Sequence, residues 1–84
     1  MRGVVAEFGF KVAERVKAGV RTATMGQIQD LAVEPLGDAF VLKGSCSAFY
    51  LRKEAIDAAK LHIAEAVESM VIPDVDLIDL IEVQ

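Results

Sequence analysis

The sequence has little of what most enzymes and metal sites are built from. Its 84 residues include one cysteine, Cys46, one histidine, His62, and no tryptophan. A single cysteine excludes an internal disulfide and any metal site made of several cysteines, and a lone histidine is a poor start for a metal site. Catalysis needs a nucleophile, a base and an orienting group within reach of one another. We expect a packed thiol at Cys46, a boundary side chain at His62, and neither catalysis nor a cofactor.

Long apolar runs are also missing. No uncharged apolar stretch approaches the roughly 20 residues that a membrane-spanning helix needs. Glu7 and Lys11 interrupt the segment where a signal peptide would have its apolar core. The composition of 54% hydrophobic and 26% charged residues is that of a globular domain. We therefore expect one domain over residues 1–84 in the cytoplasm, or in the envelope or periplasm if the chain is a fragment of an exported protein.

Cations are scarce outside the first 21 residues. The net charge is −4, but residues 1–21 carry five cations and two acids, which gives +3, while residues 22–84 carry four cations and eleven acids, which gives −7. The acidic part repels nucleic acid and anionic lipid alike. A favourable surface for phospholipid could come from the first segment, through its basic residues Lys11, Arg15, Lys17 and Arg21. The simpler interpretation of these four residues is a solvated helix face.

The first half of the chain predicts a helix followed by a hairpin. Apolar residues recur every fourth position from Phe8 to Val20, which is typical of an amphipathic helix that ends near Gly26. Residues 28–34 and 39–43 then form two strands. Between them Pro35–Asp38 predicts a turn, in which Gly37 allows a positive φ. A connection this short makes the two strands antiparallel.

The second half predicts a helix and a final strand. Ser47 is placed to cap the helix, because its hydroxyl can accept a hydrogen bond from an unpaired backbone N–H. Residues 75–83 form the strand, with Ile78 and Leu80 on one face and Asp79 interrupting the other. The buried stripe of the helix is expected at Ile56, Ala59, Ile63, Ala66, Val67 and Met70.

The element order helix, strand, strand, helix, strand predicts an α+β two-layer sandwich, in which both helices pack on one face of a three-stranded mixed sheet. The other face would then expose Val41, Ile78 and Leu80, joined by Ala39. An apolar patch of this kind marks a partner surface, often for a second copy of the chain. We expect association through this face or through a sheet edge, although scattered apolar residues are also normal on small domains.

The stretch from Leu31 to Ala59 resembles a BON domain, named after bacterial osmotically induced and nodulation proteins. The family pattern has two strands joined by a short turn, an apolar-x-Leu-x-Gly motif, an alanine-rich helix and a closing strand. These parts match Phe40–Gly44, Glu54–Ala59 and Leu77–Val83, with Asp79 where Asn or Asp is usual, and the resemblance covers residues 10–83. Residues 47–52 are similar to a serine–aromatic–tyrosine–basic stretch in a planctomycete-type branch of the family.

This resemblance implies a binding module rather than an enzyme. The family is linked to phospholipid surfaces and to envelope or large-assembly proteins, often in tandem copies, whereas this chain has one copy. Gly44, which ends the motif, implies a structural role, because glycine permits a positive φ or the close approach of two backbones. The partners implied are a second copy, another protein or a phospholipid surface.

Other chemistries lack support in the sequence. Asp74, Asp76, Asp79 and Glu82 could suggest calcium, but the central glycine and twelfth-position glutamate of an EF-hand loop are missing. No GXXG loop of the kind that clamps RNA in KH modules occurs. The aromatic and basic residues 49–53 are interpreted as the first turn of the second helix, anchoring it to the core. Nucleic acid is therefore not an expected partner.

Overall fold

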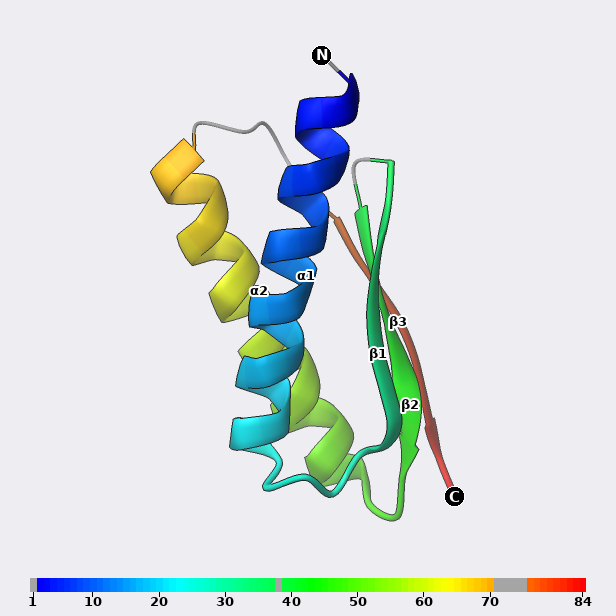
Figure 1. Cartoon of the computed structure of the whole chain (residues 1–84). Coiled ribbons are helices and arrows are strands. Elements are labelled where there is room, and N and C mark those ends of the chain that lie inside the picture. Colours follow the sequence, from blue (N-terminus) through cyan, green and yellow to red (C-terminus); the bar gives the residue numbers. More distant parts are fainter. Residues whose placement is uncertain (1, 38, 71–75) are drawn as a thin grey trace.

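Two helices cover one face of a three-stranded sheet (Figure 1). The computed structural model describes residues 2–37, 39–70 and 76–84, and the surroundings of side chains within 9–37, 39–66 and 76–84. The predicted fold class and element order are confirmed. In chain order the elements are α1 (Arg2–Ala23), β1 (Gln29–Leu36), β2 (Ala39–Cys46), α2 (Phe49–Met70) and β3 (Asp76–Val83).

The sheet is mixed, with β2 in the centre. β1 pairs with β2 antiparallel through the hairpin, and β3 pairs with the other side of β2 in parallel after the crossover through α2. Side chains of successive strand residues point to opposite faces. Phe40 and Leu42 therefore lie in the core beneath the helices, whereas Val41 and Lys43 belong to the opposite face.

The apolar spacing of α1 produces its buried side. Val12, Val16 and Val20 are buried in the core, while the side chain of Phe8 lies outside the described residues. The helix ends at Ala23, where the buried hydroxyl of Thr24 donates a 2.8 Å hydrogen bond to the Val20 carbonyl.

The second helix packs largely through small side chains. Ile56 is half-buried, and the side chains of Val67 and Met70 lie outside the described residues. Within residues 49–66 of the helix the buried positions are Leu51, Ala55, Ala59, Ile63 and Ala66, two of which, Leu51 and Ala55, lie outside the expected stripe.

The start of α2 differs from the prediction by one residue. The helix begins at Phe49, and the backbone N–H of Leu51 donates to the carbonyl of Ala48 over 3.2 Å. The N-cap position is therefore Ala48, and Ser47 precedes it. The Cys46 thiol also donates to the Ala48 carbonyl, over 3.3 Å. Serine is a preferred N-cap residue and alanine is not, which is why the sequence predicts the cap one position too early.

The hairpin is tighter than the sequence indicated. Pro35 was expected in the turn, but it lies in β1 opposite Phe40, and Leu36 pairs with Ala39. An edge strand tolerates proline, because the missing N–H costs no hydrogen bond when that side of the strand is unpaired. The connection is thus reduced to Gly37, whose φ is +59°, and residue 38.

Gly44 lies inside β2, opposite an irregularity in β1. β2 continues to Cys46, beyond the expected end at Lys43. The β1–β2 register shifts between Gln29 and Ala32, where Asp30 has a φ of +54°. Gly44 itself has a φ of +155°, and a Cβ added to it would lie 2.5 Å from Cγ2 of Ile28. Both the backbone conformation and the contact with β1 thus require glycine at this position.

Candidate interaction surface

The face of the sheet that points away from the helices carries the residues expected to bind a partner. We call this surface the open face. Val41 lies opposite Ile78 in the parallel register, and Lys43 lies opposite Leu80. Ile78 is 39% exposed and Leu80 is 52% exposed, whereas Val41 is buried although it lies outside the core cluster. The neighbouring strands thus cover Val41, and the accessible apolar surface is centred on β3.

The apolar part of the open face extends to the hairpin. Leu36 pairs with Ala39 and is 62% exposed. The prediction of a turn over residues 35–38 leaves Leu36 out of the expected surface, whereas the structure places it in β1. The alternation of Ala32, Glu34 and Leu36 along one strand face is the signal that could have found it.

Charged residues surround this apolar surface. Glu34 lies diagonally across from Lys43, and their side chains form a 2.8 Å ion pair. Asp76 and Glu82 are exposed at the two ends of β3 and take part in neither ion pair found between described side chains. Since Glu34 compensates Lys43, the uncompensated charge of the open face is acidic and lies along β3.

Both edges of the sheet are poorly suited to pairing with another strand. The outer edge of β1 contains the irregularity at Asp30 and the proline at position 35, which has no N–H to donate. The outer edge of β3 carries three acids within eight residues, Asp76, Asp79 and Glu82. Bulges, prolines and inward-pointing charges are the devices by which sheet edges avoid pairing. The open face, and not an edge, is therefore the better candidate surface.

Asp79 has a structural partner. It points toward the helical layer, where Arg52 of α2 forms an ion pair and hydrogen bond with its Oδ2. Its Oδ1 accepts a 3.0 Å hydrogen bond from the N–H of Ile81. The acid that interrupts the apolar side of β3 thus attaches the first turns of α2 to the sheet.

Three of the four basic residues of α1 lie on its outer side, whereas Lys17 lies at the flank, next to buried Ala13 and Val20. Lys11, Arg15 and Arg21 are exposed, and Lys17 is half-buried. Phe10, which is 64% exposed, lies beside them. Neither ion pair found between described side chains involves these cations.

The aromatic residues at the start of α2 do not anchor the helix. Phe49 is 73% exposed and Tyr50 is 60% exposed, so the expectation that they pack against the core is wrong. Leu51, which is 2% exposed, makes the contact with the core instead. Residues four apart lie on the same side of a helix, so Leu51 lies on the buried side together with Ala55 and Ala59, whereas Phe49 and Tyr50 do not.

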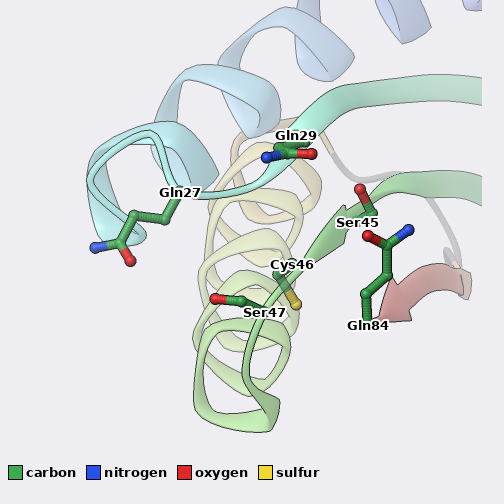
Figure 2. A pocket seen from close by; sticks show the side chains of 6 residues that line it. All are labelled: Gln27, Gln29, Ser45, Cys46, Ser47 and Gln84. Atoms are coloured by element: carbon green, nitrogen blue, oxygen red, sulfur yellow. The ribbon is translucent and has the colours of Figure 1, made fainter.

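A pocket lies at the end of the sheet where β1 begins and where β2 and β3 end, next to the β2–α2 connection (Figure 2). The thiol of Cys46 is buried, as expected for a packed cysteine. His62 is not among the residues that line this pocket. Its lining is Gln27, Gln29, Ser45, Cys46, Ser47 and Gln84.

The imidazole of His62 lies between the helices. It packs so closely on the backbone of α1 that a Cβ added to Gly19 would lie 2.1 Å from its Cδ2 and Nε2 atoms. Among the described residues, no group of three or more His, Cys, Asp or Glu side chains is placed to hold a metal ion. Asp74, one of the acids considered for calcium, lies outside the described residues.

Neither helix, over the residues that the structure describes, has the length and apolar character needed to cross a membrane. No family model, no curated protein and no solved structure matches this chain. Over the residues that the structure describes, the chain is an α+β two-layer structure whose helices leave the second face of the sheet uncovered.

Proposed function

We propose that this chain is a non-catalytic interaction module that associates with further copies of itself, or docks on a larger assembly, through the open face. The observation that carries this proposal is the exposure of Ile78, Leu80 and Leu36 on the sheet face opposite the two described helices. Burying such apolar side chains in a contact favours association, by a free energy of roughly 25 cal/mol per Å² of apolar surface removed from water. The resemblance to the BON domain, a family of binding modules, supports the same function.

The first test is the solution mass of the chain, measured by light scattering over a wide concentration range. We expect a dimer or larger oligomer that becomes monomeric on dilution. The variant Ile78→Asp/Leu80→Lys should fold and remain monomeric, because charged groups at the centre of the contact lose their hydration on association. A matched control, Met25→Lys/Leu61→Asp, makes the same kind of change at two exposed positions outside the open face and should associate as the natural chain does.

A monomer at every concentration would exclude self-association. The second candidate, a phospholipid-surface module, rests on the exposed cations of α1 and on Phe10 beside them. A basic helix surface with an exposed aromatic side chain suits an anionic lipid interface. It would be supported if vesicles containing anionic phospholipid bound the chain at low salt and released it at high salt, since exposed charges are screened by salt.

A further inference from the structure

The two outer surfaces of the sandwich carry opposite charge. On the outer side of α1, the exposed cations Lys11, Arg15 and Arg21 outnumber the single described acid, Glu14, which gives a formal charge of +2, and half-buried Lys17 adds a cation at the side of the helix. On the open face, the three acids Glu34, Asp76 and Glu82 outnumber the single cation Lys43, which gives −2. The helices lie on one side of the sheet (Figure 1), so these two surfaces point away from each other.

The two surfaces also match in length and in apolar content. Asp76 and Glu82 are six residues apart in β3, about 20 Å at the usual rise of a strand. Lys11 and Arg21 are ten residues apart in α1, about 15 Å at the rise of a helix, and long basic side chains can cover the difference. Each surface has apolar groups near its charges, with Phe10 and Ala18 exposed on α1.

A symmetric contact between two open faces would be unfavourable. In such a dimer the same patch meets itself, so the uncompensated Asp76 and Glu82 of one copy approach the acidic β3 of the other. Like charges brought together across an interface disfavour association. A contact between the open face and α1 instead brings acids against cations and leaves Ile78 and Leu80 to pack beside Phe10.

We propose that copies of this chain associate head to tail, with the basic outer surface of α1 of one copy on the open face of the next. This inference rests on the proposed function and specifies its partner surface. Each copy then uses two different surfaces, so association continues into a closed ring or an open stack and does not stop at a symmetric dimer.

The test uses a helix variant, Lys11→Glu/Arg21→Glu, and the face variant Ile78→Asp/Leu80→Lys. Each variant alone should be monomeric, because each has lost one of the two surfaces. Mixed in equal amounts, they should form a 1:1 complex that stops at two chains, since the face variant still offers α1 and the helix variant still offers the open face. The natural chain should form larger species that dissociate at high salt. Light scattering measures all four masses.

A matched control reverses two cations on the other helix. Lys53→Glu/Lys60→Glu changes the net charge by the same amount at exposed positions of α2 and should leave association unchanged. If the natural chain associates and the helix variant still associates equally well, head-to-tail packing is wrong while self-association stands. If the natural chain is a monomer at all concentrations, self-association and this inference both fail.

Discussion

At the scale of one residue, Gly44 allows β2 to approach the start of β1 closely. A Cβ at this position would lie 2.5 Å from Cγ2 of Ile28 and 3.0 Å from the carbonyl oxygen of Gln29, and its φ of +155° disfavours any other residue. We expect Gly44→Ala to lower the free energy of unfolding by about 2–3 kcal/mol, through overpacking and backbone strain together. Urea denaturation followed by circular dichroism measures this change.

Gly26 provides the control for that experiment. Its φ is +72°, but a Cβ added to it meets nothing within 4 Å. Gly26→Ala should therefore cost about 1 kcal/mol, from the left-handed conformation alone. Equal losses for the two variants would show that the contact between Gly44 and the start of β1 contributes nothing.

At the scale of the elements, the crossing of the two helices depends on Gly19 and His62. Adding a methyl group at Gly19 in the natural chain displaces the imidazole, so Gly19→Ala should destabilise by about 1 kcal/mol or more. In a His62→Ala background the same change should stabilise by about 1 kcal/mol, because alanine is the better helix former. The double-mutant cycle is measured by urea denaturation, and additive effects would contradict the packing described here.

Sequence patterns predicted the elements better than their contacts. The spacing of Val12, Val16 and Val20 places the buried side of α1 correctly, because a helical period is a strong local signal. The bounds of β1 and the exposure of Phe49 and Tyr50 could not be predicted in the same way. They depend on how far the β1–β2 pairing continues and on which way α2 rotates against the sheet, and both are set by tertiary packing.

The candidate surface was predicted in part. Ile78 and Leu80 follow from the two-residue alternation of one strand, whereas the burial of Val41 depends on side chains of two other strands. The ion pair of Asp79 was not foreseen either, because its partner Arg52 lies 27 residues away in the sequence.

At the scale of the whole molecule, that ion pair joins the helical layer to an edge of the sheet. The Asp79 side chain is 17% exposed and that of Arg52 is 40% exposed, so solvent screens the pair in part. We expect Arg52→Met and Asp79→Asn to lower the free energy of unfolding by about 1 kcal/mol each, with a coupling energy of about 1 kcal/mol that shrinks in 1 M salt.

The pair between Lys43 and Glu34 serves as the comparison. It is more exposed, at 47% and 56%, and lies within the hairpin. The cycle of Lys43→Met and Glu34→Gln should therefore give a coupling energy below about 0.5 kcal/mol. A larger value for this pair than for Arg52 and Asp79 would reverse the ranking that burial predicts.

The central position of β2 has a consequence for the order in which the chain folds. The hairpin that pairs β1 with β2 closes over two residues, whereas pairing β3 with β2 requires the 29 residues between Cys46 and Asp76 to bring the strands together. Long loops close at a greater entropic cost, so we expect β3 to dock last. Until β3 docks, one side of β2 is an unpaired edge whose backbone groups can form hydrogen bonds with another strand. The β3 strand of a neighbouring chain fits that side of β2 in the same parallel register, so this interval is when two copies would exchange their last strands.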